Sequence, residues 1–203
     1  MNPLTTIKGT IISGAVLAIV IAVVVALATG DGSISFNVQS LIIWLHVLAG
    51  ITWIGLLYYF NFVQMPALAA AGKDQGGPGG AGISKYVAPR ALLWFRWAAV
   101  ATWLTGAGYL LHSGMFVAAF TLSGTGLNIG IGAWLGTIML FNVWVLIWPN
   151  QKKVLGLVEA TADEIAKARR VATLASRFNA LLSIPMLMSM AGPFAHTHAG
   201  FFL

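Results

Sequence analysis

The chain has 203 residues, of which 59% are hydrophobic and only 8% are charged. Soluble domains carry about a quarter of charged residues, so this composition excludes a water-soluble globular protein. Cysteine is absent, which excludes disulfides, thiolate metal ligands, iron–sulfur clusters and covalently attached c-type haem. The net charge is +6, but the basic residues are too scattered for a phosphate-tracking stripe, so no nucleic-acid partner is expected.

Five apolar runs are long enough to cross a bilayer, because a spanning helix needs about 20 apolar residues. In chain order they cover residues 9–28, 38–68, 91–120, 127–148 and 175–191. The first run follows Lys8 and has features of a signal peptide, but its length favours a retained membrane anchor. Pro149 is expected to end the fourth run, and residues 150–170 are expected to form a surface helix.

These runs predict an all-α fold. We expect a single polytopic membrane domain, covering residues 1–203, with five transmembrane helices. Helices two to five are expected to form a four-helix bundle, and the lipid bilayer is the expected environment.

The basic residues fall on one side of this topology. Five crossings put the N-terminus and the segments 69–90 and 149–174 on the same side, which holds most Lys and Arg residues. The segments 29–37 and 121–126 and the C-terminal tail contain neither. The positive-inside rule then predicts a bacterial inner (cytoplasmic) membrane protein with a cytoplasmic N-terminus and a periplasmic C-terminus.

Two histidines form a candidate haem site. His46 lies eight residues after Val38, and His112 lies eight residues before Phe120, so antiparallel helices would bring both to a similar depth, about 12 Å below the outer boundary. Two imidazoles on neighbouring helices can hold haem b, and Gly50, one turn after His46, leaves room for a flat macrocycle. We predict His46 and His112 as axial ligands; the alternative is that each only hydrogen-bonds within the bundle.

The C-terminal segment offers a candidate copper site. Thioether and imidazole groups together suit copper, and here Met190 is followed by His196 and His198. The alternative is that the methionines only fill gaps in an apolar helix.

Polar residues near the predicted cytoplasmic helix ends form a third group. The candidate cluster consists of Asn61, Arg96, Asn142 and Asn179, with Gln64 and Arg177 nearby. Such side chains can hold helices together or line an anion-attracting pocket, whereas arginines at helix ends can also extend to the headgroups. Catalytic residues remain unidentified.

Four segments resemble the membrane domain of the bacterial membrane-bound urate oxidase (urate hydroxylase) family. They read LHVLAGITWIGLLYYFNFVQ from Leu45, LLWFRWAAVATWLTGAGYLL from Leu92, LGTIMLFNVWVLIWPNQKKV from Leu135 and SRFNALLSIPMLMSM from Ser176. The resemblance implies a redox-associated membrane bundle in which His46 matches a family histidine. The second helix is also similar to haem-binding four-helix membrane families.

The chain departs from that family in ways that bear on its function. Relatives are longer and carry a C-terminal cytochrome c domain, and they have histidines in the segments that match residues 92–93, 129–132 and 175–179, where this chain has none. We therefore expect a shortened form that is not catalytic on its own. It is interpreted as a redox-associated subunit that binds haem b within a larger membrane complex; the alternative is a cofactor-free accessory or scaffolding subunit.

Overall fold

The computed structural model describes residues 2–29 and 36–191. Every regular element in these two ranges is a helix. The chain divides into two compact units, Met1–Val38 and Gln39–Leu203, and each unit is described by itself.

The first unit is a single apolar helix. A short 3-10 turn, Pro3–Thr5, precedes α1, which runs from Ile7 to Thr29. Asn2 caps the 3-10 turn, because its side-chain oxygen accepts a hydrogen bond from the Leu4 N–H at 2.9 Å. Helix α1 is apolar along nearly its whole length, so its surface requires a nonpolar surrounding.

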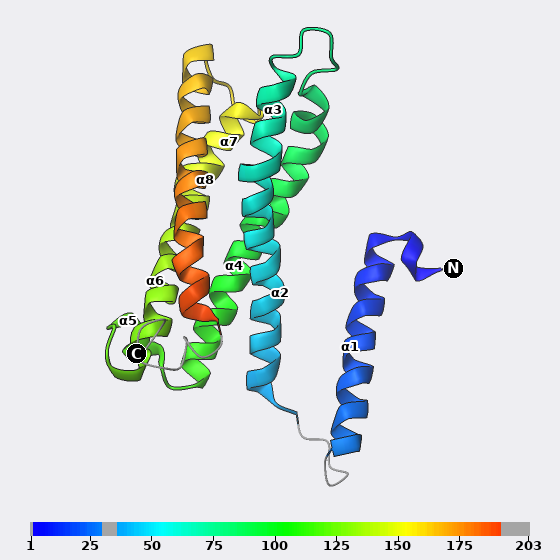
Figure 1. The fold of residues 1–203 in the computed structure, drawn as a ribbon, viewed down its shortest axis with the longest axis vertical. Helices are drawn as coiled ribbons and strands as arrows, with labels where there is room; N and C mark the ends of the chain where they lie inside the picture. The colour runs from blue at the N-terminus through cyan, green and yellow to red at the C-terminus, as the bar shows by residue number, and fades with distance from the viewer. Residues whose placement is uncertain (1, 30–35, 192–203) are drawn as a thin grey trace. The chain divides into compact units, whose positions relative to one another are not determined.

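The second unit is a bundle of four long helical columns (Figure 1). The first column joins α2 (Val38–Tyr58), η2 (Tyr59–Gln64) and α3 (Met65–Ala71). The second joins η3 (Ile83–Val87) and α4 (Ala88–His112), and the short α5 (Phe116–Phe120) and η4 (Gly124–Gly126) follow it. The third joins α6 (Leu127–Phe141), η5 (Asn142–Ile147) and α7 (Trp148–Val154), and the fourth is α8 (Ala162–Met190).

A wide, π-helical turn precedes a proline in three of these columns. Pro66, Pro89 and Pro149 each stand at the second position after such a turn. A proline inside a regular helix clashes with the carbonyl four residues back, and a π turn is a common adjustment of the helix around such a defect. The prediction that Pro149 ends the fourth helix is therefore wrong, since the helix continues to Val154.

The helix predicted at residues 91–120 ends earlier than expected. Gly114 takes a positive φ of 69°, and the Met115 N–H donates to the Leu110 carbonyl while the Gly114 N–H donates to the Leu111 carbonyl. These two hydrogen bonds form a Schellman cap, which terminates a helix with glycine in the left-handed region. Helix α4 accordingly ends at His112, and residues 116–120 form the separate helix α5.

The expected surface helix at residues 150–170 is not a separate element. Its first residues belong to α7, and its last ones form the first turns of α8. Between them Thr161 begins α8 with a capping box, in which Thr161 and Glu164 satisfy each other's backbone N–H groups. This local signal starts the fifth spanning helix well before residue 175.

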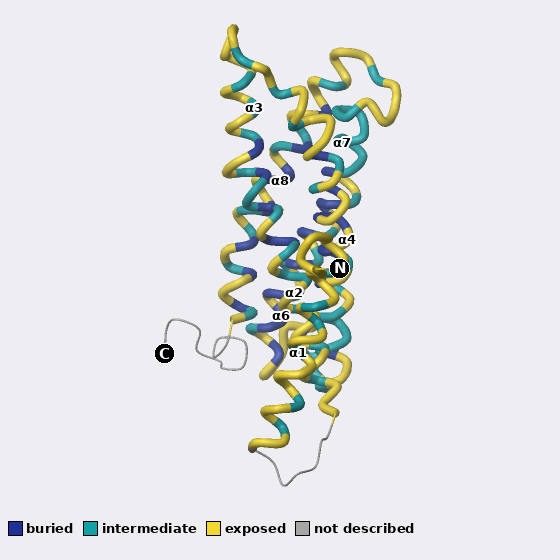
Figure 2. Tube along the Cα trace, turned by 90° about the vertical axis from the view of Figure 1, so that its right-hand side faces the viewer, coloured by how far each residue is buried: buried dark blue, intermediate teal, exposed yellow. Residues whose placement is uncertain are grey.

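The core lies on the inward faces of the four columns (Figure 2). Trp53, Leu57, Phe95 and Met139 are almost completely buried, and Phe60 packs edge-on against Phe95 at 5.4 Å between ring centroids. Large apolar side chains cover much of the outer surface of the same helices, which is the distribution of a bundle in lipid rather than in water.

Four helices of the described chain are long and apolar enough to cross a membrane: Ile7–Ala28, Val38–Ala71, Gly124–Val154 and Ala162–Met190. The 25-residue helix α4 lies in the bundle of the second unit and is long enough as well, although Arg90 and Arg96 make it less apolar. The prediction of an all-α polytopic membrane protein is confirmed.

Candidate functional site

An apolar cavity of about 720 Å³ lies inside the bundle. Residues of α2, α4, α6 and α8 line it, and its wall is mainly aliphatic, aromatic and glycine. Cofactor and ligand sites typically have volumes of about 300–1,000 Å³ and a mostly apolar lining with a few polar groups. The cavity therefore has the size and character of a small-molecule site within a membrane bundle.

His46 borders this cavity, and its hydrogen bonds hold the ring in place. Its Nδ1 lies 2.9 Å from the Thr102 carbonyl oxygen and 3.2 Å from Thr105 Oγ1. A carbonyl oxygen only accepts, and the Thr105 hydroxyl is already directed at the Ala101 carbonyl, 2.6 Å away. Nδ1 therefore carries the proton, and in the neutral ring Nε2 keeps a lone pair.

Gly106 provides the space for the His46 ring. A Cβ atom at position 106 would lie 2.9 Å from His46 Cε1, closer than carbon atoms of this kind approach each other. Gly50 lies one turn after His46 and also borders the cavity. Gly106 thus makes room for the imidazole between α2 and α4.

Trp53 contributes a second polar group to the same wall. It follows His46 by seven residues on α2, which places the two on one helix face, and both border the cavity. Trp53 is buried, and its indole Nε1–H has no hydrogen-bond partner within the described residues. A buried donor without a partner is costly, so an acceptor atom of a bound molecule would stabilise this site.

His112 does not border the cavity. It is exposed at the end of α4, six residues beyond Gly106, which is about 9 Å along the helix axis. The matched depth expected for His46 and His112 depended on a helix that ended at Phe120, whereas α4 ends at His112. The structure therefore does not bring these two histidines to one cavity.

The opposite wall carries two thioethers. Met186 and Met190 of α8 border the cavity, and each packs against a glycine of α6, Gly136 and Gly132 respectively. The predicted copper site combined Met190 with His196 and His198, which lie outside the described residues. Within the described chain no group of three or more His, Asp or Glu side chains is placed to hold a metal ion.

The predicted polar cluster divides into separate contacts. Asn142 Nδ2 donates to Asn179 Oδ1 at 2.8 Å, and Asn179 Nδ2 donates to the Met139 carbonyl at 2.9 Å. Both asparagines are buried. This pair joins α6 and η5 to α8, so its geometry is that of a structural hydrogen bond between membrane helices.

A second set of contacts joins the α2 column to α8. Asn61 Nδ2 donates to Ser176 Oγ at 2.9 Å, and the Tyr58 hydroxyl lies 2.9 Å from Ser183 Oγ. Asn61 Oδ1 and Gln64 Oε1 are buried without a hydrogen-bond partner within the described residues. The α2 column therefore carries two buried side-chain oxygens that could each accept a hydrogen bond.

Arg96 is buried, and no acidic side chain of the described ranges pairs with it. Its guanidinium carbon lies 3.4 Å from the centroid of the Trp148 ring and 6.0 Å from that of Trp144, while the side chain as a whole is 8% exposed. Nε and Nη1 have no hydrogen-bond partner in the described part of the chain, and neither does Trp144 Nε1. Arg96 is thus held by stacking rather than by hydrogen bonds with the predicted cluster.

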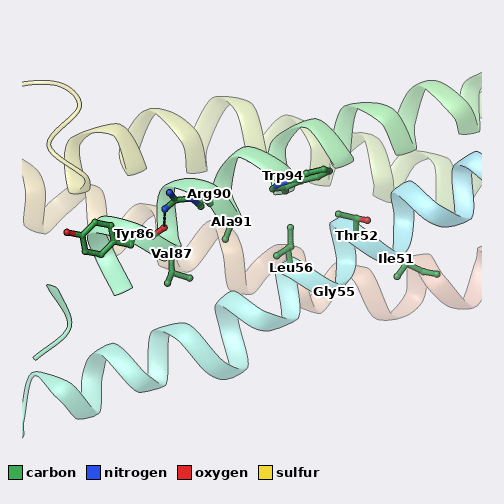
Figure 3. Close-up of a pocket in the computed structure, with 9 residues that line it drawn as sticks. All are labelled: Ile51, Thr52, Gly55, Leu56, Tyr86, Val87, Arg90, Ala91 and Trp94. Carbon is green, nitrogen blue, oxygen red and sulfur yellow. Dashed lines mark hydrogen bonds between the residues drawn. The ribbon is translucent and has the colours of Figure 1, made fainter. Parts of the chain in front are cut away.

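A shallower pocket of about 560 Å³ lies on the surface of the bundle, between α2 and the start of α4 (Figure 3). Arg90 and Trp94 border it on one side, and Ile51 and Leu56 border it on the other. The Arg90 guanidinium is occupied locally, since its Nη1 donates to the Tyr86 carbonyl. None of the residues singled out from the sequence borders this pocket.

Residues 109–200 match a protein family described as urate oxidase N-terminal. This confirms the resemblance to a urate oxidase N-terminal-like membrane domain over a little under half of the chain. The matched range includes Met186 and Met190 in the cavity wall, but not His46 or Arg96. Neither the curated proteins nor the solved structures contain a match to the chain.

Proposed function

We propose that this urate oxidase N-terminal-like membrane protein is a redox-associated subunit that binds haem b in the cavity of its bundle. His46 is the residue that carries the proposal. Its Nδ1–H is held by the Thr102 carbonyl, and the lone pair of Nε2 is then available beside an apolar cavity. A metal-ligating histidine almost always donates its other ring N–H to such an oxygen.

The cavity residues fit a flat apolar cofactor with one polar edge. Gly106 makes room for the His46 ring, Gly50 also borders the cavity, and the indole N–H of Trp53 can donate to an acceptor oxygen. When bound, haem b supplies one-electron transfer. The protein orients the ligating imidazole, excludes water through its apolar wall, and holds a proton donor near the polar edge.

Methionines of α8 are the candidates for a second ligand to haem iron. His112 is exposed and off the cavity, whereas Met186 and Met190 of α8 border it. Histidine with methionine is an established axial pair that raises the reduction potential of haem iron relative to two histidines. We therefore assign one histidine and one thioether to this site, in place of the two histidines expected from the sequence.

The proposal also covers the membrane, the orientation of the chain in it and its partner subunits. Basic residues gather at one end of the bundle, as in Lys152 and Lys153 at the end of α7, which supports a cytoplasmic membrane protein with that end in the cytoplasm. Exposed aromatic side chains such as Trp94 and Trp97 are suited to contacts with other membrane subunits. Electron transfer by a bundle this small requires a donor and an acceptor, and such subunits can supply them.

The absorbance of the purified full-length chain tests the cofactor. Protein from haem-supplemented cells is expected to give b-type bands in a reduced-minus-oxidised difference spectrum. His46→Ala is expected to lose these bands, and His112→Ala serves as the matched control and is expected to keep them. A featureless wild-type spectrum, or equal spectra for wild type and His46→Ala, overturns the proposal.

A cofactor-free accessory subunit is the second candidate. It is favoured by the buried Asn142–Asn179 contact, which stabilises the bundle without any ligand. In that case the wild-type spectrum is featureless while the chain still co-purifies with other membrane subunits on a native gel. Migration as a free monomer with no haem bands argues against both candidates.

A further inference from the structure

Among the described residues, no acidic side chain forms an ion pair with Arg96. The sequence has only five acidic residues, and none of them lies in the α2–α3, α4 or α6–α7 columns. Lys153 forms an ion pair with Glu164 in the described part of the chain, and Arg96 takes no part in it. A buried cation without a counter-charge is unfavourable, so an anion bound beside Arg96 would stabilise the folded protein.

The donors around Arg96 point to an oxyanion. Arg96 Nε and Nη1 and the neighbouring Trp144 Nε1 are buried donors that have no acceptor within the described ranges. The planar guanidinium lies against the Trp148 ring, which fixes its orientation and lowers the entropy lost on binding. Guanidinium N–H groups donate charge-assisted hydrogen bonds to phosphate oxygens.

The depth of Arg96 in the bundle matches that of a lipid phosphate. The 15 residues of α6 and the 6 of η5 contain no charged side chain and rise about 30 Å, which is the thickness of a hydrocarbon core. Trp148 follows directly at the end of this length, and Lys152 and Lys153 come one turn later. Arg96 on the Trp148 ring therefore lies at the boundary between hydrocarbon and headgroups, where tryptophans concentrate.

We propose that Arg96, Trp144 and Trp148 form a binding site for a phosphate group, supplied by an anionic phospholipid headgroup. Arg96 donates to the phosphate oxygens, Trp144 donates through Nε1, and Trp148 supports the guanidinium from its face. The site is independent of the cavity beside His46, which Arg96 does not border.

Thermal unfolding of the delipidated full-length chain in neutral detergent tests this site. Three additives are compared: phosphatidylglycerol, diacylglycerol with the same acyl chains, and inorganic phosphate. Phosphatidylglycerol is expected to raise the unfolding midpoint of the wild type, because a ligand that binds only the folded state stabilises it. Diacylglycerol, which lacks the phosphate, is expected to leave the midpoint unchanged.

Two arginine variants locate the effect. Arg96→Gln is expected to weaken phosphatidylglycerol binding by about 10- to 100-fold, as the loss of a charge-assisted hydrogen bond implies. Arg177→Gln removes the same charge from an exposed position on α8 and is expected to respond like the wild type. Trp144→Phe keeps an aromatic ring but removes the indole N–H, so a smaller loss of affinity is expected. This variant tests the site on its own if Arg96→Gln does not fold.

Each result decides one part of the proposal. An equal shift with inorganic phosphate supports the phosphate site but assigns it to a soluble anion instead of a lipid. An equal shift with diacylglycerol overturns the proposal, because the acyl chains then account for the binding. A full phosphatidylglycerol response in Arg96→Gln overturns it as well.

Discussion

Gly106 of α4 lies directly against the ring of His46 on α2. The space that a Cβ atom would take at position 106 is within 2.9 Å of His46 Cε1 and 3.3 Å of Nδ1. The ring therefore keeps its hydrogen bond to the Thr102 carbonyl only while residue 106 has no side chain. This contact couples the packing of two helices to the orientation of the candidate ligand.

Gly106→Ala is expected to destabilise the protein and to reduce haem binding. The added methyl group forces either the ring or the helices to move, and such overpacking costs about 1–3 kcal/mol. Gly108→Ala is the matched control, because nothing lies within 4 Å of a Cβ at that position; it is expected to be neutral or to stabilise by up to about 1 kcal/mol. Unfolding midpoints and difference spectra of both variants measure the contrast, and equal effects would refute the steric argument.

Thr105→Val is expected to weaken haem binding without unfolding the bundle. Valine has nearly the shape of threonine, but it removes the acceptor that lies 3.2 Å from His46 Nδ1. Loss of such an outer partner typically reduces affinity by about 10- to 100-fold. Thr52→Val removes a hydroxyl that bonds only to its own helix and controls for the substitution. Haem titration of the two variants gives the comparison, and equal affinities would show that Thr105 does not position the imidazole.

The helices of the bundle are predictable from the sequence, but their ends are less so. A run of about 20 apolar residues is long enough to span a bilayer as a helix, so the spanning helices can be located from the sequence alone. The end of α4 depends on Gly114 taking a positive φ, and a glycine after His112 and Ser113 was an available signal for it. Pro149 misled the prediction because a π turn before it lets the helix continue.

The candidate site was only partly predictable for a related reason. His46 is recognisable as an ionisable residue within a membrane helix. Its partners Thr102 and Gly106 lie more than 50 residues away in the chain, and the register of α2 against α4 depends on packing that one sequence does not reveal. The predicted pairing of His46 with His112 assumed a register of α2 against α4 and a helix that continued to Phe120. Helix α4 ends at His112 instead.

Thr161→Ala is expected to destabilise the protein by about 1 kcal/mol, the usual effect of removing an N-cap. Thr161 Oγ1 accepts the Glu164 N–H, and the Glu164 carboxylate accepts the Thr161 N–H at 2.9 Å. Thr161→Ser keeps the same contacts and is expected to behave like the wild type. The unfolding midpoints of the two variants test whether this capping box starts α8, and equal midpoints would contradict it.

Asn179→Leu is expected to destabilise the bundle more than a surface change of the same kind. It leaves the buried Asn142 amide without its acceptor, and an unsatisfied buried group costs about 1–3 kcal/mol. Asn150→Leu is the control, because Asn150 is bonded only to the Leu146 carbonyl of its own column and lies near the helix end.

The double variant Asn142→Leu/Asn179→Leu separates lost hydrogen bonding from lost packing. Replacing both partners with apolar groups removes the unsatisfied amide, so the double variant is expected to be more stable than Asn179→Leu alone. Unfolding free energies of the wild type, the two single variants and the double variant complete the cycle. If the two single effects simply add, the asparagines do not interact, and the stability of this end of the bundle comes from packing instead.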